Sequence, residues 1–90
     1  MTLGPVGQGI AEKLSAAFSP VSLDVVDESY RHHGHAGARP DGESHFRVRI
    51  VSREFSGKSR VDRHRMINAV LAEELKAHVH ALAIHASPPE

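Results

Sequence analysis

One stretch near the middle of the chain restricts the fold most strongly: Phe46, Val48 and Ile50 alternate with Arg47 and Arg49. A repeat of two residues is that of a β-strand with one buried and one solvated face. The arginines require the second face to stay wet. A sheet that contains this strand is therefore expected to carry its hydrophobic core on one side only.

Two further segments read as short strands. Residues 21–25 alternate apolar with polar side chains, and Val26 breaks the alternation, which leaves a bulge or a second covered face open. Residues 80–84 place His80, Leu82 and Ile84 on one face of a third strand. With 90 residues, the chain is long enough for one domain with a modest core.

A first helix is expected before these strands. Pro5 suits the first turn of a helix, and apolar residues at positions 10, 14, 17 and 18 form one stripe, so the helix should end near Phe18. Pro20 is expected to hold Ser19 in an extended conformation, which would stop the helix there.

A second helix is expected after the middle strand. Ser59 and Asp62 resemble a capping pair, and the spacing predicts a helix over residues 60–76. Its apolar stripe should face the core, with Glu73 and Glu74 on wet faces.

The order helix, strand, strand, helix, strand predicts an α+β domain. The first two strands are expected to pair antiparallel, and a right-handed crossover through the second helix should make the last two parallel. The prediction is a three-stranded mixed sheet covered by helices on one face. It forms a single domain over residues 1–90, with its core at about 8–86 and a frayed tail at 87–90.

Composition excludes several classes of function. Lys and Arg together number 11, as do Asp and Glu, so any attraction to nucleic acid must be local. The chain has no cysteine, and no apolar run approaches the roughly 20 residues of a membrane span. A cytoplasmic protein without membrane contact is expected. The polar residues Asp27, Glu28, Ser29 and His32 read as a strand end that enters a loop, so we expect no enzyme.

Histidine is the unusual component: there are eight, and His32, His33 and His35 lie in a glycine- and proline-rich loop over residues 29–42. Imidazole binds iron, zinc or copper, and a site shared with another protein would need few ligands from this chain. His80 is the other candidate ligand. Each candidate also has an alternative without a metal. The loop histidines could be solvated polar residues, and His80 could be a buried, hydrogen-bonded structural residue.

A basic stretch covers residues 45–65, where seven Lys or Arg residues stand against one Glu and one Asp. Cations at the start of a helix oppose its dipole, which indicates a role beyond helix stability, and arginines there could reach DNA phosphates or guanine. The alternative is that they form the wet faces of a strand and a helix. The candidate DNA-binding residues are Lys58, Arg60, Arg63, His64 and Arg65.

Four strings resemble the BolA family in order and spacing. They are LDVVDESYRHHGHAG at residues 23–37, ESHFRVRIVSREFSGKS at 43–59, VDRHRMINAVLAEEL at 61–75 and VHALAIHA at 79–86. The combination of S-H-F, F-x-G-K, R-H-R and V-H-A-L is specific, and the chain is identified as a member of this family. The resemblance implies a KH-like (class II) αββαβ fold without the GxxG loop that clamps nucleic acid.

The resemblance also implies a cofactor and partners. BolA-type proteins pair with monothiol CGFS-type glutaredoxins and share a [2Fe–2S] cluster, to which the glutaredoxin cysteine and glutathione supply sulfur. By resemblance, His80 in V-H-A-L is one ligand from this chain. His32 is the implied loop ligand, and His35 is the second choice because this loop is extended. The implied role is iron–sulfur trafficking or iron and redox regulation.

A second function comes with the same resemblance. The family includes bacterial transcriptional regulators of morphology and stress genes, and residues 55–75 resemble their helix–turn–helix-like region. Duplex DNA is thus an alternative partner, and transcription regulation the alternative function. Some family members form dimers in crystals, so weak self-association is a further expectation.

Overall fold

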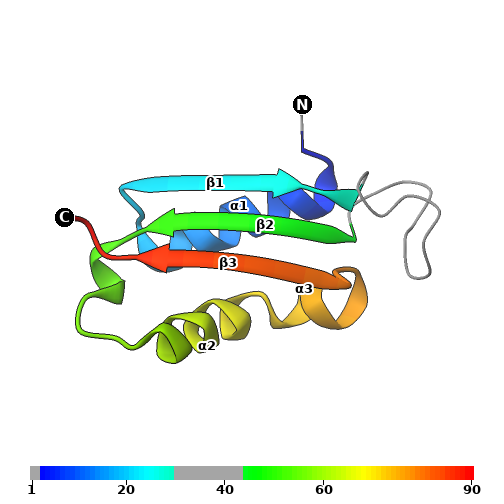
Figure 1. Cartoon of the computed structure of the whole chain (residues 1–90). Helices are drawn as coiled ribbons and strands as arrows, with labels where there is room; N and C mark the ends of the chain where they lie inside the picture. Colours follow the sequence, from blue (N-terminus) through cyan, green and yellow to red (C-terminus); the bar gives the residue numbers. More distant parts are fainter. Residues whose placement is uncertain (1–2, 30–43) are drawn as a thin grey trace.

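Three strands form one mixed sheet in the computed structural model, which describes residues 3–29 and 44–90 (Figure 1). β1 (Ser22–Asp27) and β2 (His45–Val51) pair antiparallel along the whole of β1. β3 (Ala81–Ser87) lies on the other side of β2 and runs parallel to it. The predicted α+β class and the mixed three-stranded sheet are confirmed.

The first helix, α1 (Pro5–Phe18), begins and ends where the sequence predicted, but its end has a different cause. Ser19 adopts a left-handed conformation, with φ 43°, and donates its N–H to the carbonyl of Ser15 at 3.1 Å. The prediction that Pro20 holds Ser19 extended is therefore wrong. A capping bond to an otherwise unpaired helix carbonyl outweighs the local preference of a residue before proline.

The single helix predicted over residues 60–76 is two helices. A 3-10 turn, η2 (Arg53–Phe55), leads into α2 (Arg60–Val70), whose first turn Ser59 caps through its hydroxyl as predicted. Leu71, with φ −99° and ψ 18°, separates α2 from α3 (Ala72–Ala77). Leu71 is fully buried, so core packing holds the break in place. None of the described helices is long and apolar enough to cross a membrane.

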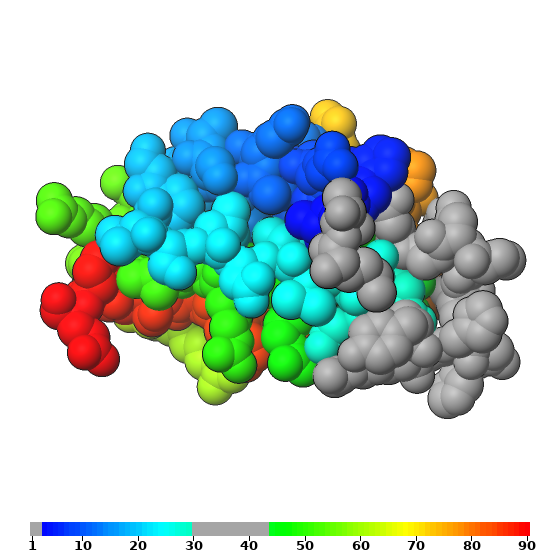
Figure 2. Space-filling view, turned by 90° about the horizontal axis from the view of Figure 1, so that it is seen from above, coloured from blue at the N-terminus to red at the C-terminus, as the bar shows by residue number. Residues whose placement is uncertain are grey.

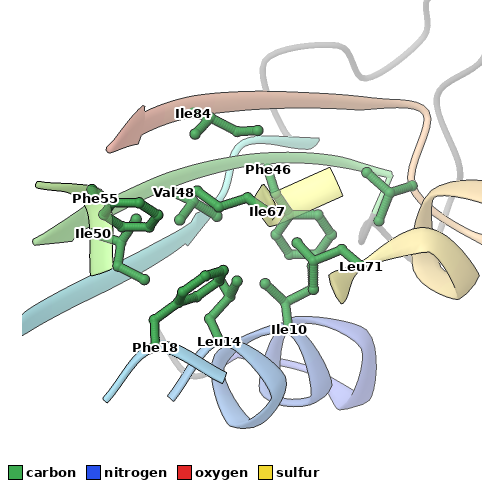
Figure 3. Packing of buried hydrophobic residues seen from close by; sticks show 11 residues of the cluster. Ile10, Leu14, Phe18, Phe46, Val48, Ile50, Phe55, Ile67, Leu71 and Ile84 are labelled. Atoms are coloured by element: carbon green, nitrogen blue, oxygen red, sulfur yellow. The ribbon is translucent and has the colours of Figure 1, made fainter. Parts of the chain in front are cut away.

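The core lies between one face of the sheet and the helices (Figure 3). Phe46, Val48 and Ile50 point from β2 into this space, as their alternation predicted. The helices and the neighbouring segments fill it from the other side. The remaining buried apolar residues are Ile10, Leu14, Phe18, Phe55, Ile67, Leu71, Val79 and Ile84.

The opposite face of the sheet is open. Arg49 is exposed, Arg47 is half-buried and Val26 is 38% exposed. The register of β1 against β2 continues without interruption through Val26, so the broken alternation marks an apolar residue on the open face and not a bulge. Figure 2 shows α1 in blue on one side of β1, with side chains of the green part of the chain projecting on the other.

An ion pair joins α1 to α3. Lys13 Nζ lies 2.8 Å from Glu74 Oε2 and 3.8 Å from Glu73 Oε2. The Glu73 side chain is 91% exposed, as predicted, but that of Glu74 is only 14% exposed. The prediction of a wet face is wrong for Glu74, because its carboxylate turns toward the lysine of the neighbouring helix.

This ion pair shifts both pKa values in the directions that favour the charged forms. The hydrogen bond to Glu74 raises the pKa of Lys13 above its ordinary value, against a smaller opposing effect of burial. Burial raises the pKa of Glu74, but the hydrogen bonds from Lys13 and the backbone, with the charges of Lys13 and His78, together outweigh it. The net pKa of Glu74 is therefore lowered.

The last strand extends one residue into the predicted tail. The carbonyl of Ser87 accepts the N–H of Ser52 at 3.0 Å, and β3 ends only there. The expectation that the chain frays from residue 87 is wrong for Ser87, because the end of β2 continues to pair with it.

Candidate functional site

Two buried serines hold together the positions that flank residues 30–43. The Oγ of Ser29 accepts the backbone N–H of Ser44 at 2.9 Å and that of His45 at 3.1 Å. Glu28 donates its N–H to the carbonyl of His45 at 2.7 Å, which extends the antiparallel pairing beyond β1. A buried hydroxyl must find partners, and here it joins the two segments that flank residues 30–43. We call Ser29, Ser44 and His45 the loop base.

His80 lies directly beside the loop base. The carbonyl of Ser44 accepts the N–H of His80 at 2.6 Å and that of Ala81 at 3.1 Å, immediately before β3 pairs with β2. The main chain of His80 is thus held in place while its side chain is exposed. Of the two alternatives for His80, the buried structural residue is wrong. Its position before the first paired residue of β3 turns it out of the core.

A second imidazole accompanies His80. The ring centroids of His45 and His80 are 5.8 Å apart, with 47° between the ring planes. The Nδ1 of His45 lies 2.8 Å from the hydroxyl of Ser44, which orients the ring. Sequence reasoning did not single out His45. The available signal was the parallel register, because the first residues of β2 and β3 lie side by side at one end of the sheet.

The other predicted ligands, His32 and His35, and their neighbour His33 lie outside the described residues. Within residues 3–29 and 44–90, no group of three or more His, Asp or Glu side chains is arranged to hold a metal ion. The sequence contains no cysteine. A metal centre that uses His80 would therefore take further ligands from residues 30–43, from solvent or from another molecule.

The candidate DNA-binding residues lie around the start of α2 in unequal environments. Lys58, Arg60 and Arg65 are exposed, and His64 is half-buried. Arg63 is half-buried, and its Nη1 donates to the carbonyl of Ala86 in β3 at 3.2 Å. Its Nε is buried without a partner among the described residues. Arg63 therefore packs the start of α2 against β3, whereas the exposed cations could meet a phosphate backbone.

Asp27, Glu28 and Ser29, which the sequence predicted to form a strand end that enters a loop, lie at the end of β1 and directly after it. Asp27 Oδ1 accepts the N–H of Ser29 at 2.9 Å, and the Ser29 hydroxyl is buried against two backbone N–H groups. Glu28 pairs with Arg47, with 3.1 Å between Oε2 and Nη2. These contacts support the reading as a strand end.

Comparisons with known proteins point to one family. A family model described as "BolA-like protein" matches residues 14–90. The "DNA-binding transcriptional regulator BolA" of Escherichia coli (strain K12) is 56% identical over 80 residues, which cover 89% of this chain and 72% of the regulator. Neither description names an enzyme.

A plant protein is similar over almost the whole chain. "SufE-like protein 1, chloroplastic/mitochondrial" of Arabidopsis thaliana is 50% identical over 93 residues, 99% of this chain. The chain spans only 25% of that relative's length. The solved BolA domain of SufE1 from Arabidopsis thaliana superposes with a TM-score of 0.89 at 51% identity, covering 98% of this chain and 96% of that structure.

Proposed function

Since the chain belongs to the BolA family, we propose that it is a partner of a monothiol CGFS glutaredoxin and shares a glutathione-assisted [2Fe–2S] cluster with it. The role would be iron–sulfur trafficking or iron and redox regulation. In this proposal His80 is one ligand, and a loop histidine, His32 before His35, is the other.

The observation that carries the proposal is the position of His80. Its main chain is fixed by the Ser44 carbonyl, its imidazole is exposed, and it lies at the loop base from which residues 30–43 depart. A ligand for a shared cluster must be reachable by a second protein and near a second ligand of its own chain. His80 meets the first requirement, and the loop base supports the second.

The residues present also fit the chemistry of such a group. Imidazole replaces thiolate on one iron of Rieske [2Fe–2S] centres, where it raises the reduction potential. The chain has no cysteine, so the thiolates of a shared cluster would come from glutaredoxin and glutathione. Neutral imidazole is the ligand form, so acid should weaken the complex.

The test is anaerobic co-purification with a monothiol glutaredoxin, glutathione and iron. The expected result is a heterodimer whose visible absorption and circular dichroism differ from those of the glutaredoxin alone. His80→Ala should change these spectra sharply. His85→Ala is the matched control, because His85 is also exposed and lies further along β3.

Each outcome has a defined meaning. Failure of the wild-type chain to form a heterodimer would reject the partnership. A heterodimer whose spectra are the same for His80→Ala and wild type would remove His80 from the cluster. His32→Asn and His35→Asn then decide the loop ligand, since only replacement of the true ligand should change the spectra.

DNA binding is the second candidate function, favoured by the exposed cations and by the regulator from Escherichia coli that shares 56% of the aligned residues. The structure suggests how to test it. Arg63 is hydrogen-bonded to β3, so its replacement would mix binding with folding. Arg60→Ala/Arg65→Ala removes two exposed cations instead.

The expected result for this candidate is a shift of duplex DNA that weakens as salt increases. The double variant should weaken binding and reduce the slope of the salt dependence. If binding is absent or does not depend on salt, DNA binding is rejected and only the cluster function remains. One feature argues against a standard helix–turn–helix: α3 is only six residues long and carries the exposed carboxylate of Glu73 in its first turn, which would repel phosphate.

A further inference from the structure

We propose that one exposed stripe of α2 contacts base edges in the major groove of duplex DNA, with Val61 against a thymine methyl group and Asn68 bound to an adenine. The proposal rests on the second candidate function and deepens it, because neither residue is among the candidate DNA-binding cations. It states which side of the helix faces the bases and which base pairs the protein should prefer.

The burial of α2 separates a packed side from a solvent-facing side. Ile67 is fully buried, and Val70 packs against the core. A helix turns by about 100° per residue, so one stripe of side chains points directly away from this core. The members of that stripe are all exposed: Val61, Arg65 and Asn68. In Figure 1 the helix lies at the margin of the molecule, beside β3.

The side chains of this stripe form an unusual combination. Val61 is 57% exposed in the first turn of α2, and a single exposed apolar residue would decide nothing by itself. Here an arginine and an asparagine follow it on the same stripe. Apolar groups contact the thymine methyl, arginine binds guanine and asparagine binds adenine through two hydrogen bonds. The composition of the stripe therefore fits base recognition better than a solvated face.

The dimensions of α2 also suit a major groove. A groove about 12 Å wide admits one α-helix, and α2 has 11 residues. A rise of ~1.5 Å per residue places Val61 and Asn68 about 10 Å apart along the axis, which is roughly three base-pair steps when the helix lies along the groove. Ala69 is small and exposed beside Asn68, so it lets the helix approach the bases closely.

The charges around the stripe indicate how the helix would approach the duplex. Lys58 and Arg60 are exposed at the start of α2, and contacts from such cations to phosphates set position without selecting sequence. The exposed acid Asp62 lies on the other flank of the stripe and would repel phosphate. The Arg60 flank should therefore face the phosphate backbone. Arg63 fastens the packed side of α2 to β3, so the helix is oriented before DNA binds.

The test is selection of sequences from random duplex oligonucleotides by the whole chain, followed by titrations at several salt concentrations. Wild type should enrich a thymine and an adenine about three base pairs apart. Asn68→Ala should reduce the preference for adenine roughly five- to a hundredfold, since a good contact to a base discriminates by this much. Asparagine is uncharged, so the salt dependence should remain that of wild type. Val61→Ala should weaken only the preference for thymine.

A substitution that exchanges the preferred base separates recognition from folding. Asn68→Arg should replace the preference for adenine by one for guanine, because arginine is the usual partner of guanine. A structural role of Asn68 would not create a new preference. Arg60→Ala is the matched control, since Arg60 is exposed but lies outside the stripe. It should reduce the salt slope by about one and leave the selected sequence unchanged.

The inference is overturned if the selected duplexes share no sequence, or if wild type and both Asn68 variants select the same one. DNA binding as a function survives that result when binding still weakens with salt. If wild type does not bind duplex DNA, the second candidate function and the inference are both rejected. The cluster proposal depends on neither outcome.

Discussion

At each end of the sheet a buried serine hydroxyl forms hydrogen bonds with main-chain groups, but the surroundings of the two serines differ. At the packed end, formed by Phe18, Ser52 and Phe55, the Ser52 hydroxyl donates to the Phe18 carbonyl at 2.7 Å and accepts the Glu54 N–H at 3.1 Å. At the histidine end, which comprises the loop base and His80, the Ser29 hydroxyl accepts two N–H groups. A buried serine satisfies main-chain groups at both ends.

What lies next to each serine differs. The packed end continues into two buried aromatic rings whose centroids are 5.0 Å apart. The histidine end continues into an exposed imidazole. Strands of this length separate the two ends by about 20 Å. Buried apolar residues lie at both ends, since Phe46 and Val79 adjoin the two histidines. We infer that the candidate chemistry lies at the histidine end alone, and that a change at the packed end has little effect on it.

The largest expected effect comes from the packed end. Phe55→Ala should lower the free energy of unfolding by ~3–5 kcal/mol, because it leaves a cavity against Phe18 in a fully buried site. Chemical denaturation measures this loss. The folded fraction should keep the His45 and His80 resonances of wild type, and a large change in those resonances would contradict the separation of the two ends.

The next effect compares the two serines directly. Ser29→Ala and Ser52→Ala should each lower the free energy of unfolding by ~1–3 kcal/mol, because each leaves buried main-chain groups without a hydrogen-bond partner. Only Ser29→Ala should also move the amide resonance of His80, through the displaced Ser44. If Ser52→Ala moved that resonance equally, the ends would be coupled through β2.

A smaller effect on stability depends on pH and comes from Glu74, which lies at neither end of the sheet. The pKa of Glu74 is lowered in the folded chain. Its contribution to stability is therefore present above the ordinary glutamate pKa and is lost as the pH falls through the lower folded-state pKa. Glu74→Gln should destabilise the chain at neutral pH, and the difference from wild type should shrink in acid.

Thermal unfolding across the acidic range measures this prediction. Glu73→Gln is the matched control, because its carboxylate lies further from Lys13 and is 91% exposed. The curves of Glu73→Gln and wild type should nearly coincide. A pH-independent difference between Glu74→Gln and wild type would show that the ion pair is not the cause.

The smallest effect on stability should come from the residue with the greatest proposed functional importance. His80→Ala should change the free energy of unfolding by less than about 0.5 kcal/mol, because the imidazole is exposed and alanine keeps the main-chain bond to Ser44. Denaturation of the isolated chain tests this. A larger loss would indicate that the contact with His45 is structural.

The strands and the core could be predicted from sequence because they depend on alternation. Phe46, Val48 and Ile50 are buried as their spacing required. Details that depend on tertiary contacts could not. The break at Leu71 comes from core packing, and the capping bond of Ser19 overrides the influence of Pro20.

The candidate site was predictable in part. His80 is identifiable from the V-H-A-L string, but its exposure is not, since alternation alone placed it with Leu82 and Ile84. His45 lies close to His80 because of the register in which β2 and β3 pair. The sequence predicts that these strands are parallel but does not predict that register. The predicted parallel pairing places the starts of these two strands at one end of the sheet, but residue spacing does not set the distance between two side chains there.

The shared acceptor at Ser44 makes the amide of His80 a natural reporter. That amide donates to the first residue after positions 30–43, so its hydrogen exchange records how often the strand entry opens. Any ligand that binds beside the loop base and His80 should slow this exchange before a structural change becomes visible. The measurement needs neither a chromophore nor a labelled partner, and it follows occupancy from the protein's own main chain.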